Sequence, residues 1–446
     1  ISGNALFRNN YALGGSSSNG GVAGQAAGTD LFIMKGGAVT LAPGAGKVIR
    51  FEGSIADDSL ASIGNGSWAA GEGADITIAG GGLVQFAGAN TYSGKTIITG
   101  ATLQADYGQG INANSSVVFK GQGQVTGTGG IDPSNAGVLM LSTDLFQRLG
   151  TAVPGQISWN GAGGFASANT SGIIIDFGRT ANTPGTGQTM IWGASYLTTN
   201  STLVFGSEYG LGSVTLMNNI DLGAGTRSIV VFDSRQEVNG SVVADAAYLR
   251  GNLTNGSLRV GDAGYSGALF LLGQNSLSKL IVEEGTVLTG DGTTVGRLFA
   301  AAGAPVEVKA GGTLRLFGSE NVTTLDVANG GAFGNAEGTT LKTSSAITNA
   351  GTAQFGGKVE APALVNAHPD RGAEFRRWPD HQPGRHRDHR RRRLRRRARH
   401  HRGVGRQFHR WRGGYGARHR QCGHGGRECG LSSAQPDEQC GRGGKH

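Results

Sequence analysis

The sequence predicts an all-β protein built as a solenoid, a stack of short strands and turns that covers residues 1–366. Glycine accounts for 81 of the 446 residues and only 37% of the chain is apolar, which is unlike a compact helical domain. So much glycine indicates many tight turns, because turns often require positive φ. A strand-and-turn pattern also recurs along the chain, which is the mark of a repeat architecture.

The recurring pattern starts from a glycine and occurs three times, at Gly82, Gly267 and Gly312. Apolar residues follow two and four positions later, and this alternation is typical of a half-buried strand. The three pairs are Val84 and Phe86, Leu269 and Leu271, and Leu314 and Leu316. A second glycine comes at six positions, as Gly88, Gly273 and Gly318.

The second half of each copy predicts a turn and another strand. Asparagine suits the turn, because its side chain bonds to nearby backbone and it tolerates the left-handed region. After an asparagine at eight or nine positions come apolar residues at ten and fifteen and a glycine at eighteen: Asn90, Tyr92, Ile97 and Gly100; Asn275, Leu277, Val282 and Gly285; Asn321, Val322, Val327 and Gly330. The alternative is that these are ordinary loop asparagines of a β-sandwich.

A single coil of this kind is too weak to stand alone. Burying about five apolar side chains contributes about 1.5–3 kcal/mol each, whereas ordering about twenty residues costs roughly 1–2 kcal/mol each. Stacking must supply the difference through hydrogen bonds shared between neighbouring coils. The sequence therefore predicts coils of about twenty residues that lie one above the next.

The segment Gly88–Gln104 carries the most specific motif of the chain, GANTYSGKTIITGATLQ. It resembles the autotransporter-associated β-strand repeat, whose pattern runs glycine, Asn-Thr-Tyr, Ser/Thr-Gly, a Thr-rich strand and Gly-Thr-Leu. Gly94 and Leu103 fall on this pattern, and Ala101 departs from it.

Other segments extend the resemblance discontinuously over about residues 7–366. Phe7–Gly15 is similar to repeats of polymorphic outer-membrane proteins. Five further segments resemble middle coils of autotransporter passengers: Trp159–Phe165, Ile191–Gly193, Leu203–Ser207, Asn219–Leu222 and Arg227–Val231.

This resemblance implies a right-handed parallel β-helix that is exported through an outer-membrane β-barrel translocator and displayed at the bacterial cell surface. Such passengers commonly serve adhesion, aggregation or display, so we expect a noncatalytic extracellular scaffold or adhesin with a host-surface or glycan ligand. The translocator is expected outside this chain, since no set of alternating ten-residue strands closes it. The alternative is a β-helical polysaccharide-degrading enzyme or a glycan-binding protein.

Charge divides the chain near residue 367. Residues 1–367 hold 18 Lys+Arg and 24 Asp+Glu, a net charge of −6, and residues 368–446 hold the remaining 22 and 7, a net charge of +15. All ten histidines and all three cysteines lie in the second part. We expect residues 367–446 to form a disordered basic tail, or to be the product of a reading frame shifted by one base.

The tail carries no specific binding signal. A segment this basic binds polyanions nonspecifically, so no specific nucleic acid is expected as a partner. The spacing of Cys422, His424, Cys429 and Cys440 matches no usual zinc finger or ribbon.

Residues 1–367, here called the body, have the features of an exported fragment. A chain without cysteine can cross an oxidising compartment without forming a premature disulfide. It starts at Ile1 with neither an initiator methionine nor a signal segment, and it contains no run of about 18 apolar residues. We therefore expect an internal fragment without a transmembrane helix.

No catalytic, cofactor-binding or metal-binding residue is assigned in the body. A serine-protease triad needs a histidine base, which residues 1–367 lack. The acidic pairs Asp57–Asp58 and Glu283–Glu284 are interpreted as solvated surface groups, because neighbours in a strand face opposite sides. Glycan hydrolysis by such a pair is the alternative.

Three further patterns remain. A groove lined by Trp159, Trp192 and Tyr196 would bind glycans without cleaving them. The segment 70–78 is one imperfect copy of a calcium-binding nonapeptide, and we expect a turn that enters a strand at Ile76. The glycine pairs at 121 and 123 and at 127 and 129 lack the strand-to-helix context of a phosphate loop.

Overall fold

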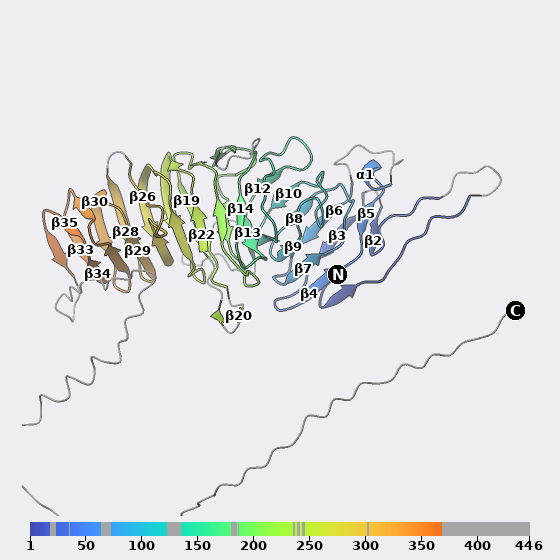
Figure 1. The fold of residues 1–446 in the computed structure, drawn as a ribbon, viewed down its shortest axis with the longest axis horizontal. Coiled ribbons are helices and arrows are strands. Elements are labelled where there is room, and N and C mark those ends of the chain that lie inside the picture. The colour runs from blue at the N-terminus through green and yellow to red at the C-terminus, as the bar shows by residue number, and fades with distance from the viewer. Residues whose placement is uncertain are drawn as a thin grey trace, which may run out of the picture. The chain divides into compact units, whose positions relative to one another are not determined.

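A computed structural model of the chain describes residues 1–367, apart from 18–23, 35, 64–72, 123–134, 180–184, 186, 235–236, 239–240, 243–245 and 301–302. The chain divides into two units, Ile1–Asp380 and His381–His446, and every described strand belongs to the first. These strands stack as the coils of a parallel β-helix (Figure 1), which confirms the predicted all-β solenoid. The predictions for residues 368–446 lie outside the described residues.

One sheet of 16 strands runs through the first unit. In spatial order its main path is β1 (Ala5–Phe7), β4 (Val48–Phe51), β7 (Leu83–Phe86), β9 (Thr102–Gln104), β11 (Gly137–Leu141), β13 (Ala162–Ser167), β16 (Thr202–Phe205), β19 (Thr226–Val231), β24 (Gly256–Val260), β26 (Leu277–Val282), β28 (Ala304–Val308), β30 (Glu320–Val327), β32 (Thr340–Thr343) and β35 (Lys358–Glu360). Off this path, β33 (Ile347–Asn349) pairs with β30, and β36 (Leu364–Asn366) pairs with β33.

The remaining strands form shorter sheets. A five-stranded sheet contains β12 (Ile157–Trp159), β10 (Val117–Phe119), β8 (Thr96–Ile98), β6 (Asp75–Ile78) and β3 (Ala38–Leu41). An eight-stranded sheet contains β14 (Ile173–Ile175), β17 (Val214–Leu216), β22 (Ala246–Leu249), β25 (Ala268–Leu271), β27 (Gly285–Leu288), β29 (Gly312–Leu316), β31 (Ala332–Asn335) and β34 (Thr352–Phe355). A three-stranded sheet contains β15 (Met190–Ile191), β18 (Ile220–Asp221) and β23 (Leu253–Thr254), and β2 (Leu31–Ile33) pairs with β5 (Ile55–Asp57).

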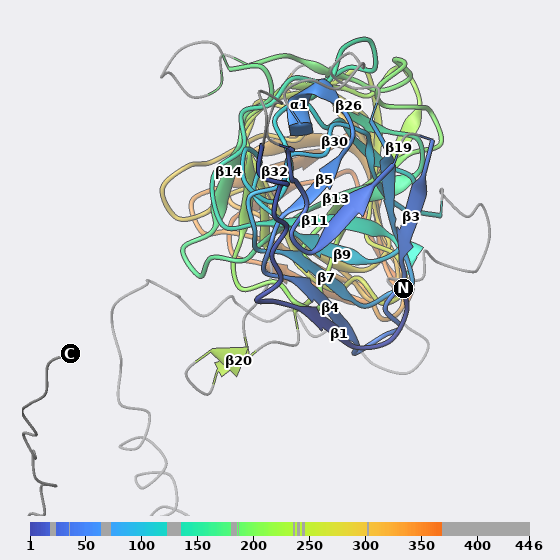
Figure 2. The same ribbon diagram turned by 90° about the vertical axis from the view of Figure 1, so that its right-hand side faces the viewer.

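Pairing between coils is parallel along the whole 16-stranded sheet. Figure 2 looks along the stack and shows successive coils lying behind one another. The antiparallel hairpin β20 (Glu237–Val238) and β21 (Ser241–Val242) stands away from the coils in both views. A four-residue helix, α1 (Leu60–Ile63), follows β5.

Coil length differs from the predicted value of about twenty. Leu83 in β7 pairs with Thr102 in β9, a spacing of 19 residues that fits the prediction. Ala5 in β1 pairs with Ile49 in β4, a spacing of 44 residues. Loops outside the stacked strands take up the extra residues, because insertions there leave the hydrogen bonds between coils intact.

The interior of the coils is a continuous apolar core that extends from Ile33 to Ile347. Aromatic rings repeat from coil to coil: the ring centroids of Phe7 and Phe51 lie 4.4 Å apart, and those of Phe51 and Phe86 lie 5.8 Å apart. Each ring therefore packs on the coils before and after it, which is the stacking that a single coil lacks.

The three predicted repeats contain the predicted strands, but they do not occupy the same part of a coil. The segment from Gly82 begins with β7 of the 16-stranded sheet, whereas those from Gly267 and Gly312 begin with strands of the eight-stranded sheet. In β8 the inward-facing residues are Thr96 and Ile98, so the apolar residue of the motif, Ile97, lies on the outer face of its strand. Alternation marks an inward face on any sheet, and therefore it cannot assign a strand to one of them.

Most repeat glycines allow neighbouring coils to approach closely. A Cβ on Gly88 would lie 2.0 Å from the carbonyl oxygen of Gly53, and one on Gly273 would lie 2.2 Å from that of Gly251. Positive φ, the predicted reason for glycine, occurs among the repeat glycines only at 285 and 330, with φ of +77° and +85°.

Candidate functional site

Buried asparagines tie three successive coils together at their corners. Asn275 is fully buried, accepts a hydrogen bond from the Leu253 N–H at 2.9 Å on the coil before, and donates one to the Arg297 carbonyl at 2.7 Å on the coil after. Asn90 makes the same two bonds to backbone groups on either side, both at 2.7 Å. These predicted repeat residues are therefore structural. A buried side chain that forms such hydrogen bonds to the backbone of neighbouring coils is here called a rung.

The third predicted asparagine, Asn321, is exposed, and its neighbour Glu320 occupies the corner instead. One carboxylate oxygen of Glu320 accepts a hydrogen bond from the Leu298 N–H at 2.7 Å. The other is buried and has no hydrogen-bond partner among the described residues. Burial raises the pKa of Glu320 to about 7, although backbone hydrogen bonds and the Arg297 charge oppose the shift.

The predicted aromatic groove is wrong. Trp159 and Trp192 are only 1% and 2% exposed and belong to the core. The Tyr196 hydroxyl accepts a hydrogen bond from the Ile191 N–H and donates one to the Thr189 carbonyl. Large apolar rings are most stable when they are buried between coils. Burial in the core is therefore favoured for tryptophan in this fold over an exposed position that could bind a ligand.

Asp57 is buried, so its interpretation as a solvated surface group is also wrong. One carboxylate oxygen accepts hydrogen bonds from the Ser59 and Ser62 hydroxyls at 2.5 and 2.8 Å, and the other accepts from the Ser93 N–H at 2.8 Å. Burial by itself raises the pKa of Asp57, but these hydrogen bonds outweigh it and hold the pKa below its ordinary value. The carboxylate joins the turn after β5 to the turn before β8.

The acidic pair Glu283–Glu284 agrees better with its interpretation as solvated surface groups. Glu283 is half-buried and pairs with Arg259 at 3.2 Å, and Glu284 is partly exposed in the turn before β27. In neither pair do both carboxylates take part in one cluster of hydrogen bonds. Within the described part of the chain, no group of three or more His, Cys, Asp and Glu side chains is placed to hold a metal ion.

The weaker glycine patterns yield no site. The strand expected at Ile76 is present as β6, and the Asp75 carboxylate accepts a hydrogen bond from the Lys95 N–H at 2.7 Å. Residues 70–72, 123, 127 and 129 lie outside the described residues. Over the ranges that the structure describes, no helix is long and apolar enough to cross a membrane.

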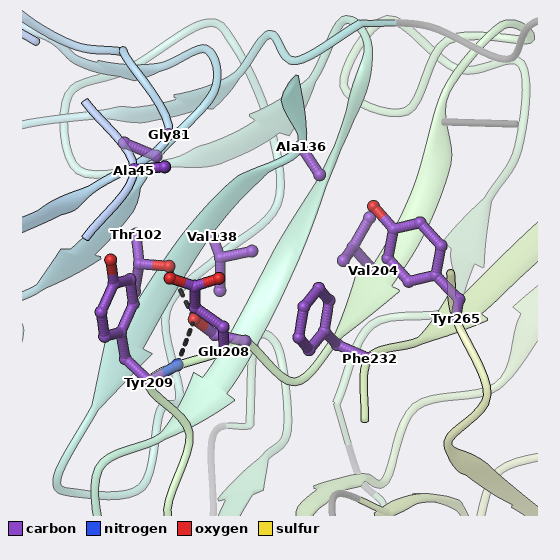
Figure 3. A pocket seen from close by; sticks show the side chains of 12 residues that line it. Ala45, Gly81, Thr102, Ala136, Val138, Val204, Glu208, Tyr209, Phe232 and Tyr265 are labelled. Atoms are coloured by element: carbon purple, nitrogen blue, oxygen red, sulfur yellow. Dashed lines mark hydrogen bonds between the residues drawn. The ribbon is translucent and has the colours of Figure 1, made fainter. Parts of the chain in front are cut away.

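The outer face of the 16-stranded sheet carries a small cleft that the sequence did not predict (Figure 3). In β11, Leu139 points into the core while Val138 packs in a second apolar cluster on the opposite face. Phe232 and Tyr265 extend this cluster and meet edge to face, with ring centroids 5.7 Å apart. The complete lining is Ala45, Gly81, Ala101, Thr102, Ala136, Val138, Val204, Ser207, Glu208, Tyr209, Phe232 and Tyr265.

The loop after β16 folds back over this sheet cleft. The Ser207 hydroxyl lies 2.7 Å from the Thr102 hydroxyl and accepts a hydrogen bond from the Tyr209 N–H at 3.2 Å. Figure 3 shows Glu208 between Tyr209 and Phe232. Burial raises the pKa of Tyr209 to about 12, and the Glu208 charge adds to the shift.

The size of the sheet cleft limits its chemistry. Its volume of about 60 Å³ corresponds to about two water molecules, whereas pockets for small organic ligands measure about 300–1,000 Å³. It therefore accommodates a methyl-sized group or water. A single carboxylate at its edge also lacks the partner that acid and base catalysis of glycan hydrolysis requires.

A larger recess, here called the corner groove, follows the corner that contains Asn275 and Glu320. Its volume is about 400 Å³. The lining is Gln274, Val295, Arg297, Gly318, Ser319, Asn321, Thr340 and Lys342, which come from successive coils. It contains two cationic side chains and no carboxylate.

No family model, curated protein or solved structure matches this chain.

Proposed function

We propose that this chain is an extracellular β-helical passenger of the autotransporter type, acting as a noncatalytic surface scaffold or adhesin. Its expected export partner is an outer-membrane β-barrel translocator encoded outside this sequence. The motif of Gly88–Gln104 supports the family assignment. The parallel stack supports the mechanical role, because an elongated scaffold needs coils that stabilise one another along one axis.

The engagement of the acidic side chains is the observation that carries the noncatalytic part of the proposal. Asp57 is held by serine hydroxyls and backbone N–H groups, and Glu283 pairs with Arg259. Glu307 lies between Lys279 and Lys309, at 2.5 and 2.7 Å. Each carboxylate makes a structural contact of its own, whereas glycoside hydrolysis needs two carboxyl groups that face one bond.

Glycan binding without turnover is the second candidate, and the corner groove favours it. The groove is long enough to cross several coils, and its side chains offer hydrogen-bond donors and acceptors without an acid–base pair. Adhesion through a glycan would use both the scaffold and this surface.

Display on a Gram-negative cell tests the proposal. The complete gene, including sequence downstream of this chain, is expressed, and intact cells are treated with protease and probed with an antibody against the body. We expect the antibody signal to disappear on protease treatment, and we expect these cells to adhere to a host-cell layer better than cells lacking the gene. A chain that is protected in intact cells, or purified protein that releases reducing sugar ends from polysaccharide, would contradict the proposal.

A further inference from the structure

We propose that the corner groove binds an acidic polysaccharide that lies along the stack, with Arg297 and Lys342 contacting its anionic groups. This inference rests on the proposed adhesive function and names the chemical class of its ligand. Four observations support it: the continuity of the groove across coils, its hydrogen-bonding groups, its two cations and the position of the nearest acids.

Backbone and side-chain contacts join the groove residues from coil to coil. Gln274 and Arg297 form a parallel bridge, and the Ser319 hydroxyl accepts a hydrogen bond from the Thr340 N–H at 2.9 Å. Asn321 and Lys342 are register partners in β30 and β32. Since neighbouring strands lie about 4.8 Å apart, four coils present polar groups over roughly 14 Å.

The repeat of the groove suits a repeating ligand. Three of the four coils contribute an amide or hydroxyl side chain and the other contributes Arg297, and the spacing between neighbouring coils is close to the length of one sugar ring. Gln274 and Asn321 can both donate and accept hydrogen bonds, and Ser319 and Thr340 add hydroxyl groups. The lining contains no aromatic side chain on which nucleic-acid bases could stack, so a saccharide fits the lining better than single-stranded nucleic acid.

The cations of the groove are available to a ligand. Neither Arg297 nor Lys342 takes part in any of the ion pairs found among the described residues. A guanidinium suits a carboxylate or sulfate because it can donate two parallel hydrogen bonds. Residues 1–367 carry a net charge of −6. The lining of the groove, with two cations and no acid, therefore has the opposite sign of charge from this part of the chain as a whole.

Each cation interacts with one acid outside the lining of the groove, Arg297 with Glu320 and Lys342 with Glu360. Glu320 is 1% exposed and accepts a hydrogen bond from the Leu298 N–H beneath the groove. Glu360 is the register partner of Lys342 on the next coil, but its carboxylate is bound by Lys358 at 2.6 Å. Lys342 is exposed, and the acid beside it already has a cation.

Lysine acetylation of the full chain distinguishes polysaccharide binding at the groove from binding by the basic tail. The protein is acetylated alone and with polygalacturonate, dextran sulfate, neutral dextran or double-stranded DNA, and each lysine is quantified by mass spectrometry. We expect polygalacturonate or dextran sulfate to protect Lys342 at least threefold, with little effect from neutral dextran. The two acidic polymers distinguish carboxylate from sulfate, and exposed Lys95 is the internal control.

Variants complete the test. Replacing both cations, as R297Q and K342Q, should raise the Kd for the protecting polysaccharide by at least about tenfold, because losing even one charge-assisted hydrogen bond has an effect of that size. The matched control K47Q with K95Q removes the same charge elsewhere and should leave the Kd unchanged. Circular dichroism melting verifies that both double variants are folded.

Three outcomes would overturn the inference. Lys342 could react equally with and without acidic polysaccharide while Lys445 in the tail is protected, which would assign all binding to the tail. Equal protection by DNA would make the groove a general polyanion surface. Equal loss of affinity in both double variants would show a net-charge effect. None of these outcomes would overturn the proposed scaffold, because the surface-display experiment tests that proposal separately.

Discussion

At the scale of single residues, buried polar groups determine how one coil joins the next. Asn275 uses its carbonyl oxygen toward one coil and its amide NH2 toward the other. An amide can serve both because it is an acceptor and a donor, whereas an ionised carboxylate only accepts. Glu320 stands at such a corner with one oxygen unpartnered among the described residues, and this predicts a pH-sensitive rung.

Replacing Asn275 by aspartate should destabilise the stack. The carboxylate keeps the bond from the Leu253 N–H but places a negative oxygen against the Arg297 carbonyl, which loses the side-chain donor and keeps only the backbone N–H of residue 275. We expect a loss of about 2–3 kcal/mol in the free energy of unfolding, measured by urea denaturation. The control is N321D, at an exposed asparagine with the same place in the sequence motif. Equal losses in both variants would contradict the rung.

Replacing Glu320 by glutamine should stabilise the protein at alkaline pH and have little effect at pH 4. The pKa of Glu320 is about 7 in the folded protein and 4.5 as its ordinary value. The folded state therefore binds more protons between these values, and stability falls as pH rises through this window. The full shift corresponds to roughly 3 kcal/mol, so E320Q should gain up to this amount at pH 8 in thermal melts. A gain that is the same at pH 4 and pH 8 would show that the carboxyl does not titrate as described.

Replacing Asp57 by asparagine should show the opposite pH dependence. The pKa of Asp57 is lowered in the folded protein, so its contribution is present at neutral pH and is lost as pH falls below about 4. We expect D57N to cost on the order of 3 kcal/mol at pH 7, because hydrogen bonds to a buried carboxylate are lost. Urea midpoints at pH 7 and pH 3 measure it, and a difference from wild type that does not shrink at pH 3 would contradict the account.

At the scale of elements, the distance between coils depends on glycines that leave no room for a side chain. The carbonyl oxygen of Gly251 would lie 2.2 Å from a Cβ at Gly273. The strands on either side are held by continuous parallel pairing, so the coils cannot separate locally without loss of hydrogen bonds.

Alanine at Gly273 should therefore destabilise the coil junction. We expect G273A to lower the free energy of unfolding by more than about 2 kcal/mol, as overpacking does in a dense interior. Gly44 provides the control, because it is exposed, its φ is not positive, and a Cβ there meets no atom within 4 Å. Similar melting temperatures for G273A and G44A would contradict the close approach.

The sequence predicted the type of element well and its surroundings poorly. Alternation around Val84 and Leu269 correctly gave strands whose motif residues are buried in the core. The same alternation could not show that these two strands belong to different sheets, or that Trp159 and Trp192 point inward. The rung at Glu320 was missed because the motif marks an asparagine at the neighbouring Asn321, and only strand register reveals which of the two faces the corner.

At the scale of the whole first unit, parallel stacking supplies what each coil lacks. The core is continuous across the coils, and the loops that lengthen some of them lie outside the paired strands. The proposed scaffold and the corner groove both depend on this order, because the groove residues come together only when four coils lie in register. The central claim is therefore that outward residues in register are separated by one strand spacing per coil.

Pulsed electron paramagnetic resonance between spin labels tests this claim most directly. With the three tail cysteines replaced by serine, labels are placed at Gln85 in β7 and at Ile281 in β26 or Asp326 in β30, seven and nine strands along the sheet. Ile281 and Asp326 are in register with each other through Glu307 and lie four residues along the strand from the register of Gln85. We expect label distances of about 36 and 45 Å, because each strand adds about 4.8 Å across the sheet and the offset adds about 13 Å along it. Distances that fail to increase with the number of coils would contradict the parallel stack.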